Sequence, residues 1–444
     1  MSHVAPSSFL FATFEGGGSV GPALTVVRKL MARGHRVRVM SDACNRFEAE
    51  ASGAAFVPWT RAPSRPDRSR ETTLLRDFEA ASPQEGLMRT VEGLMIGPSL
   101  AYARDLIDEL EREPADLVVS NEMLFGVAVG CEAVGQRLAL LTANISLFPL
   151  PGVPPMGPGL APARTDEDRA LHNAVAQGMK ALLDSQLGAL NAARAALGLP
   201  PLATAGDQMH AAERLLLGTS RAFDFAPATL PSNVRYVGPQ IDPPAWAAPF
   251  VFPWPPGDRR PLALVAFSTT FQGHVGVIQR VVDAIADLPM RGLVTLGDTI
   301  APEEVASPDN VRLVHSAPHD AVMRQAAIVV THGGHGTVVR ALLHRLPMLV
   351  MPHGRDQNDN AVRVTERGAG LALPNTATTA EIRAALSRLL SEPAFGRAAA
   401  ALGERVAEEV ESSPVVEELE GLIAAHASGA PQVAPACAGA HAGC

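Results

Sequence analysis

Cysteine is scarce in this sequence, and the few cysteines lie far apart. The four of them are Cys44, Cys131, Cys437 and Cys444. No pair has the C-x-x-C spacing of a zinc site, and such scattered positions do not indicate a disulfide framework. We therefore expect a protein of the reducing cytoplasm that folds without disulfides.

Positive charge and long apolar runs are also lacking. The net charge is −9 at pH 7 and no run of five or more Lys or Arg occurs, which argues against a nucleic-acid partner. No apolar stretch reaches the roughly 18 residues that span a bilayer, and the N-terminus has no basic segment typical of a signal peptide. These absences predict a soluble, cytoplasmic protein without stable membrane insertion.

The order of the expected elements indicates the α/β class. Apolar strands alternate with amphipathic helices at residues 8–14, 22–33, 36–41, 44–52 and 54–59. This alternation predicts a parallel, doubly wound sheet. It restarts with a strand at residues 262–267, and a chain of 444 residues is too long for one ordinary core. Two Rossmann-like domains are therefore expected.

Composition sets the expected domain boundaries. Residues 241–260 are rich in Pro, Ala and Trp and carry no regular pattern, which is typical of an interdomain linker. The first domain then covers residues 1–240 and the second covers residues 261–426. Residues 427–444 are mostly Ala, Gly and Pro and predict a disordered tail.

The most informative segment of the second domain begins at Val330. An apolar run ends there and predicts a buried strand, a glycine-rich turn follows, and residues 337–344 have helical spacing. The backbone N–H groups at the start of that helix point outward, which is a geometry that binds a diphosphate. His332 and the Thr337 hydroxyl can add further hydrogen-bond donors beside them.

Asp356 and Gln357 follow the next predicted strand, residues 347–351. The carboxyl ends of parallel strands meet at one edge of a sheet, so this pair should lie near the predicted diphosphate site. A carboxylate beside a carboxamide suits sugar hydroxyls. Together the two segments indicate a site for a nucleotide sugar.

From about residue 311 to 373 the chain resembles the donor-binding signature of the family 1 glycosyltransferases, which include antibiotic and flavonoid glycosyltransferases of bacteria and plants. Residues 311–319 are similar to the base-binding strand and loop of that family. The resemblance extends to the N-terminal strand with its glycine turn and to residues 264–270. It implies a GT-B fold, in which two Rossmann-like domains face a central cleft and the last helix crosses back to the first domain. It also implies an inverting, metal-independent reaction, with a UDP- or TDP-linked sugar as donor substrate and no other cofactor.

The resemblance also assigns the donor-binding positions, although Ser316 stands where many relatives carry a tryptophan, so UDP and TDP both stay open. His335 can equally lie on an exposed helix face, and Asp356 can be an ordinary helix cap. The donor-binding positions are Ser268, Thr269, His315, Ser316, Ala317, His319, His332, Gly333, Gly334, His335, Gly336, Thr337, Asp356 and Gln357.

The catalytic positions depart from the pattern of the family. Ser19 stands where relatives carry a histidine, and Ser120-Asn121-Glu122 stands where an aspartate follows the fourth strand. Neither Ser19 nor Asn121 titrates near neutral pH, so neither is a useful base. Glu15, Glu122 and His274 are the remaining candidates, with Glu15 preferred because it follows a strand at the edge that faces the cleft.

Three hypotheses follow from the missing dyad. A carboxylate such as Glu15 can act as the base. Alternatively, the acceptor hydroxyl is acidic enough, as in a phenol, to lose its proton with little help from a base, or the acceptor attacks through carbon. The third hypothesis is a catalytically inactive auxiliary protein that keeps only the donor fold.

An NAD site and a metal site are the two alternatives to a nucleotide-sugar site. Gly16, Gly18 and Gly21 match the G-x-G-x-x-G pattern of an NAD enzyme, with Asp42 near the position of a ribose-binding acid. That interpretation gives the polar groups of the second domain no purpose. A metal site is also disfavoured, because a glycine turn separates His332 from His335 where helical i, i+4 spacing would be needed.

Residues 61–202 are expected to shape the acceptor pocket. A hydrophobic aromatic or polyketide-like small molecule is the expected acceptor, bound through oxygen or carbon, although the same side chains can simply be core. The candidate acceptor-binding residues are Phe78, Met88, Phe125, Phe148, Met156 and His274.

Overall fold

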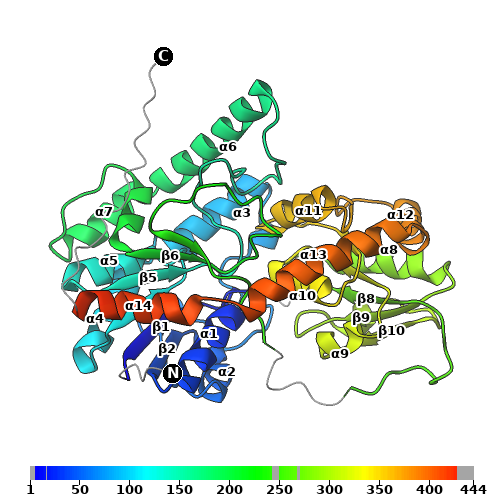
Figure 1. Ribbon diagram of the computed structural model, residues 1–444, viewed down its shortest axis with the longest axis horizontal. Coiled ribbons are helices and arrows are strands. Elements are labelled where there is room, and N and C mark those ends of the chain that lie inside the picture. Colours follow the sequence, from blue (N-terminus) through cyan, green and yellow to red (C-terminus); the bar gives the residue numbers. More distant parts are fainter. Residues whose placement is uncertain (1–5, 17, 243–249, 268–270, 428–444) are drawn as a thin grey trace.

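A computed structural model describes residues 6–16, 18–242, 250–267 and 271–427. Two parallel sheets, each flanked by helices, lie next to each other in the molecule (Figure 1). Ser268, Thr269, residues 243–249 of the predicted linker and all but the first residue of the predicted tail fall outside the described residues.

The first sheet has the strand order β3-β2-β1-β4-β5-β6-β7, and its neighbouring strands are parallel. Its strands are β1 (Ser8–Ala12), β2 (Arg36–Ser41), β3 (Ala55–Pro58), β4 (Leu117–Ser120), β5 (Leu138–Leu141), β6 (Arg214–Leu217) and β7 (Val234–Tyr236). Its helices are α1 (Val20–Ala32), α2 (Arg46–Ala51), α3 (Pro83–Thr90), α4 (Ser99–Arg112), α5 (Phe125–Val134), α6 (Asp166–Asp184) and α7 (Leu187–Ala195).

The second sheet repeats this arrangement with the order β10-β9-β8-β11-β12-β13. Its strands are β8 (Leu262–Ala266), β9 (Arg291–Thr295), β10 (Val311–Val314), β11 (Ile328–Thr331), β12 (Met348–Val350) and β13 (Gly370–Ala372). The helices that follow in the chain are α8 (Val275–Ala286), α9 (His319–Met323), α10 (His335–Leu343), α11 (Gln357–Glu366), α12 (Thr379–Ser391), α13 (Pro393–Glu411) and α14 (Val415–Ala427).

The central strands are apolar on both faces because helices cover both. β1 and β11 are buried along their whole length. Such two-sided burial is typical of parallel sheets and explains why these strands read as continuous apolar runs. The predicted α/β class with two doubly wound sheets is therefore confirmed.

The last two helices join the domains. α13 and α14, coloured orange to red, run from the second domain to the first (Figure 1). On α14, Val415, Leu419 and Leu422 share a core with residues of α1 and β1. Gly403 of α13 allows a close approach to α10, since a Cβ atom there would lie 2.0 Å from the Leu342 carbonyl oxygen.

Some expected elements differ from the observed ones. The helical pattern at residues 84–111 is divided into α3, a π-helical segment (Val91–Met95) and α4. The break between the π-helical segment and α4 falls at Gly97-Pro98, where proline cannot continue a hydrogen-bonded helix. Strands β6 and β7 were not predicted, because such short segments carry too few residues for a periodic signal.

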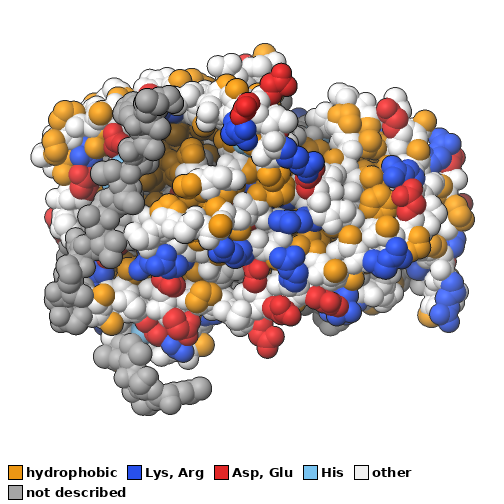
Figure 2. All heavy atoms as spheres, turned by 45° about the horizontal axis from the view of Figure 1, so that its top comes forward, with side chains coloured by type: hydrophobic (Ala, Val, Ile, Leu, Met, Phe, Trp, Pro, Cys, Tyr) orange, Lys and Arg blue, Asp and Glu red, His pale blue; other side chains and the backbone are white. Residues whose placement is uncertain are grey.

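No helix in the described ranges is both long enough and apolar enough to cross a membrane. On the face drawn in Figure 2, Lys and Arg side chains are interspersed with Asp and Glu, and hydrophobic side chains gather in a hollow.

Candidate active site

One large cleft brings together residues of both domains. Its volume is about 610 Å³, and its walls include Ser19 and Glu122 of the first domain and His332, Thr337 and Asp356 of the second. In both sheets the strand order reverses beside the first strand, between β1 and β4 and between β8 and β11. Ligands of open α/β sheets bind at such switch points. The cleft therefore lies where this topology favours a ligand.

The turn after β11 depends on its glycines. Gly333 has φ +97°, and a Cβ atom there would lie 2.7 Å from Val350 Cγ1. At Gly334 a Cβ atom would lie 2.6 Å from His332 Nε2. Glycine thus lets the imidazole of His332 lie directly against the N-terminus of α10, where backbone N–H groups are available to an anion.

His332 belongs to an aromatic cluster around Phe267. The Phe267 ring stacks on His274 and His332, with centroid distances of 5.9 and 6.2 Å, and makes an edge contact with His353. Burial lowers the pKa of His332 to about 3 and that of His274 to about 4. Both imidazoles are therefore neutral at pH 7, and that of His332, which lines the cleft, can serve a diphosphate as a hydrogen-bond partner. His274, predicted for acceptor binding, is a buried member of this cluster and does not line the cleft.

The segment after β12 forms a hydrogen-bonded loop. Gln357 Oε1 accepts from the His353 N–H at 2.7 Å, and Gln357 Nε2 donates to Gln272 Oε1 at 2.8 Å. Asn360 Nδ2 donates to Asp356 Oδ2 and to the Gly333 carbonyl, both at 2.8 Å. The loop is thereby fixed against the glycine turn.

Asp356 is buried within this loop. Burial raises the pKa of its carboxyl group, while hydrogen bonds from Asn360 and from Asn144 of the first domain oppose the rise. Its side chain makes no capping hydrogen bond at the start of α11. The structure therefore rules out the alternative in which the Asp356 side chain serves only to cap the helix.

The predicted base-binding loop is partly exposed. His315 Nε2 lies 2.7 Å from Asp298 Oδ1, both side chains are exposed, and Ser316 beside them is exposed as well. Ala317 is buried, and burial lowers the pKa of His319 to about 4. All four predicted residues of this loop line the cleft.

His335 lies between the domains. Its Nε2 is 2.8 Å from Thr219 Oγ1 of the first domain, and its ring makes an edge contact with Phe223. It is 6% exposed, which rules out the alternative of an exposed helix face. Gly336 and Thr337, the next two residues of α10, line the cleft.

Ser19 and Asn121 lie on either side of a small hole of about 10 Å³. The Asn121 side chain is occupied locally, since its Oδ1 accepts from the Met123 N–H at 2.9 Å. The remaining residues around the hole are Phe11, Ala12, Thr13, Pro22, Ala23, Val119, Ser120, Leu141, Thr142 and Ala143, so none of its walls carries an ionisable side chain. The position of the usual dyad therefore offers no base.

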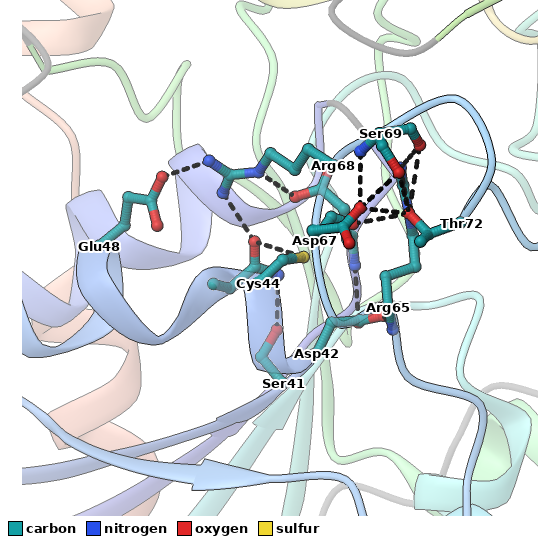
Figure 3. A network of polar contacts seen from close by, with 11 residues as sticks. Ser41, Asp42, Cys44, Glu48, Arg65, Asp67, Arg68, Ser69 and Thr72 are labelled. Carbon is teal, nitrogen blue, oxygen red and sulfur yellow. Dashed lines mark hydrogen bonds and ion pairs between the residues drawn. The ribbon is translucent and has the colours of Figure 1, made fainter. Parts of the chain in front are cut away.

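Glu15 is engaged by a segment that we call the strap, residues 60–79. Arg68 of the strap donates from Nε to Glu15 Oε2 at 3.1 Å, pairs with Glu48 and donates to Asn45 Oδ1 (Figure 3). Glu15 is buried in this ion pair, with its side chain 6% exposed. Protonating the carboxylate would break the ion pair, so the structure does not favour Glu15 as the base.

Asp42 connects the strap to the glycine turn. Its two oxygens accept from the backbone N–H groups of Glu15 and Arg65, each at 2.8 Å, and Figure 3 shows it beneath the strap. The side chain is 1% exposed. Both carboxylate oxygens are thus used by the protein itself, which removes the ribose-binding role on which the NAD interpretation depended.

The far end of the strap contacts the second domain. Arg355 Nε donates to Asp77 Oδ2 at 2.9 Å, and the Phe78 and Phe271 rings make an edge contact at 4.9 Å. The Arg70 guanidinium lies 3.6 Å from the centroid of the Phe271 ring. We call these contacts the clasp. Phe78, predicted for the acceptor pocket, is instead part of this interdomain contact.

Most of the other predicted acceptor residues lie in the core. Phe125 is 0% exposed, and Met88 and Phe148 pack against the same cluster. Of the predicted set only Met156 lines the cleft. Other apolar residues of the cleft include Leu87, Leu94, Met95, Met123 and Leu147. Two of them lie on the π-helical segment, whose register a regular helical pattern does not reveal.

Within the described ranges, no group of three or more His, Cys, Asp or Glu side chains is arranged to hold a metal ion.

Comparisons with known proteins agree with this geometry. Residues 279–425 match the family model "Erythromycin biosynthesis protein CIII-like, C-terminal domain". The chain is 29% identical to 4'-demethylrebeccamycin synthase of Lentzea aerocolonigenes over 93% of its own length and 99% of the relative. It is 36% identical to aklavinone 7-beta-L-rhodosaminyltransferase of Streptomyces galilaeus over 46% of this chain and 47% of the relative. The crystal structure of CalG4, the calicheamicin glycosyltransferase, superposes with a TM-score of 0.72 at 21% identity, covering 95% of this chain and 99% of that one.

Two facing doubly wound sheets with a shared cleft define the GT-B fold. The family match over residues 279–425 and the glycosyltransferase relatives support a family 1 natural-product glycosyltransferase. This confirms the resemblance found in the sequence.

Proposed function

We propose that the protein transfers a hexose, with inversion and without a metal, from a UDP- or TDP-linked sugar to a hydrophobic aromatic or polyketide-like small molecule. The observation that carries this proposal is the shared cleft. One continuous cavity extends from His332 and Asp356 in the second domain to Leu94, Met95 and Leu147 in the first. A polar donor wall therefore faces an apolar acceptor wall across the space where sugar transfer would occur.

The departing diphosphate would be stabilised by the turn after β11. His332 lies against the N-terminus of α10, and Thr337 in the first turn of that helix also lines the cleft. Oriented donors of this kind can replace a metal, since removing one typically costs about 3 kcal/mol of transition-state stabilisation. In this proposal the nucleotide sugar is a substrate, and no further cofactor is required.

The sugar would be held by Asp356 and Gln357. Both line the cleft, and both are fixed by neighbours, Asp356 through Asn360 and Gln357 through Gln272. Fixed acceptors of hydrogen bonds favour one arrangement of sugar hydroxyls, because little side-chain entropy is lost when the sugar binds.

The acceptor must lose a proton without the usual dyad. Since no ionisable group lines the hole between Ser19 and Asn121, the proposal favours acceptors with an acidic nucleophile, such as a phenol, or attack through carbon. Both O- and C-glycosylation are compatible with this proposal.

Calorimetry without added metal tests the donor assignment. UDP, TDP, UDP-glucose, TDP-glucose and NAD would be titrated into the full-length protein. Micromolar binding of one nucleotide series supports the proposal and selects the base. Binding of NAD alone, or of none of the five, would overturn it. Turnover of the bound sugar nucleotide with phenolic acceptors then separates an active transferase from an auxiliary protein that only binds the donor.

A further inference from the structure

Glu122 is a buried carboxyl group with an unused oxygen at the switch point of the first sheet. It lies two residues after the end of β4, lines the cleft and is 4% exposed. Its Oε1 accepts from the Leu147 N–H at 3.1 Å. Its Oε2 is buried and finds no hydrogen-bond partner in the part of the chain that the structure describes.

The surroundings of Glu122 in the cleft are apolar. Leu94, Met95, Met123 and Leu147 line the cleft together with it. A buried polar atom without a partner costs free energy, and the cost is larger for a group that can carry charge. A ligand that offers a hydrogen to Oε2 removes this cost, so the position suits a binding role better than a purely structural one.

The ionisable groups on the neighbouring elements are engaged elsewhere or neutral. Asp105 accepts from the backbone at the start of the strap, and Glu132 pairs with Arg194. Glu92 on the π-helical segment is exposed, and burial raises the pKa of the Tyr102 hydroxyl. Across the cleft the second domain presents Arg355, Asp356 and His332.

Glu122 therefore titrates without a cationic partner in the described part of the chain. Burial raises its pKa to about 8, and the N–H of Leu147 is the one contact that opposes the rise. The carboxyl group is mostly protonated at pH 7 and becomes a carboxylate as the pH rises through 8. An ionised carboxylate in such an apolar position is a strong proton acceptor.

A short segment of the chain also links Glu122 to the proposed sugar site. The segment that donates to Glu122, through Leu147, begins with Asn144, and the side chain of Asn144 hydrogen-bonds to Asp356 across the domain interface. One short segment thus contacts both Glu122 and the residue proposed to bind the sugar.

Resting on the proposed function, we propose that Glu122 binds the nucleophilic O–H of an aromatic acceptor and takes its proton. The bond from the acceptor oxygen to the anomeric carbon forms, and the bond from that carbon to the diphosphate oxygen breaks with its electron pair. The proton passes to Glu122 Oε2. The acceptor class is an apolar aromatic molecule that carries a phenol.

The test is the pH dependence of kcat/KM for Glu122→Gln against the unchanged protein. Glutamine keeps the acceptor oxygen for Leu147 and removes only the proton-accepting function. The unchanged enzyme should gain activity as the pH rises through about 8, and the variant should lose 100- to 10,000-fold and show no rise. Glu92→Gln, on the exposed side of the neighbouring segment, is the matched control and should keep full activity.

Further outcomes of the experiment keep the inference distinct from the proposed function. Donor binding by Glu122→Gln should be unchanged, and Glu122→Asp should keep a rising pH profile at reduced activity. Full activity of Glu122→Gln from pH 6 to 9.5 would overturn the inference while leaving the transferase intact. Failure of the unchanged protein to bind or transfer any sugar would instead overturn the proposed function. An equal loss of donor binding and turnover in the variant would show that Glu122 is only structural.

Discussion

The two sheets have the same kind of strand order, but the crevices at their switch points are filled in different ways. Between β8 and β11 the side chains of His332, Phe267 and Gln357 form a polar, closely packed wall. Between β1 and β4 the corresponding place holds Ser19, Asn121 and a hole of about 10 Å³. Both sheets thus have the same kind of edge, and the side chains decide that one edge can bind a diphosphate while the other lacks the usual dyad and carries Glu122 as a buried carboxyl group.

Among variants of the donor side, the largest effect is expected from removing the imidazole of His332. His332→Ala deletes the ring that lies against the N-terminus of α10, so kcat should fall by roughly 100- to 1000-fold, the usual cost of one lost transition-state donor. Turnover and calorimetric binding of the nucleotide sugar measure this. His210→Ala, an exposed histidine of the first domain, is the control. Unchanged donor binding and turnover in His332→Ala would refute the diphosphate assignment.

Asp356→Ala should separate sugar recognition from nucleotide recognition. Loss of a charged hydrogen-bond acceptor should weaken binding of the sugar nucleotide by roughly tenfold or more. Binding of UDP or TDP alone should not change, because the diphosphate wall on α10 is untouched. Both affinities are measured by calorimetry on the same preparation, and equal losses for the two ligands would contradict a role in binding the sugar.

The donor side was the easier half to predict because its residues are close in the sequence. Strand, glycine turn and helix follow one another from residue 326 to 344, so a local pattern places His332 and Thr337 at one strand end. The structure has them there. The stacking of His274 on Phe267 and the edge contact of His353 with the same ring were not predictable, because they join segments from different strand ends.

The acceptor side depends on contacts between distant residues, and sequence patterns do not reveal them. Arg355 and Asp77 are 278 positions apart, and nothing local to either predicts their ion pair. The apolar pattern also does not distinguish core from cleft, so Phe125 was assigned to the pocket although it is fully buried. Glu15 was preferred as the base because it follows a strand at the edge that faces the cleft, and its partner Arg68, 53 positions away, has no local signature.

Introducing the usual His/Asp dyad would test whether the crevice between β1 and β4 can supply a catalytic base. Ser19→His combined with Asn121→Asp should raise turnover of weakly acidic alcohol acceptors about tenfold, since imidazole is a general base near neutral pH. Aspartate can still accept from the Met123 N–H. Initial rates at pH 7 measure the gain, and thermal unfolding checks that the added ring is tolerated.

The two single variants are the controls for this experiment. Ser19→His lacks the orienting carboxylate and Asn121→Asp lacks the base, so neither should match the double variant. A folded double variant without any gain would mean that the missing dyad is not what limits these acceptors.

The smallest effect is expected at the clasp, where the two sides of the comparison meet. Asp77→Asn removes the ion pair with Arg355, the residue before Asp356, while the contacts of Phe78 and Arg70 with Phe271 remain. Partly exposed ion pairs contribute up to about 1 kcal/mol, so KM for the nucleotide sugar should rise by no more than about fivefold at a nearly constant kcat. Steady-state kinetics at varied donor concentration measure this.

Glu366→Gln, which breaks the more exposed interdomain pair with Arg164, should leave both constants unchanged. Equal effects of the two variants would indicate a general loosening of the domains, whereas an effect confined to Asp77→Asn would show that the strap of the first domain helps to hold the sugar-binding loop of the second.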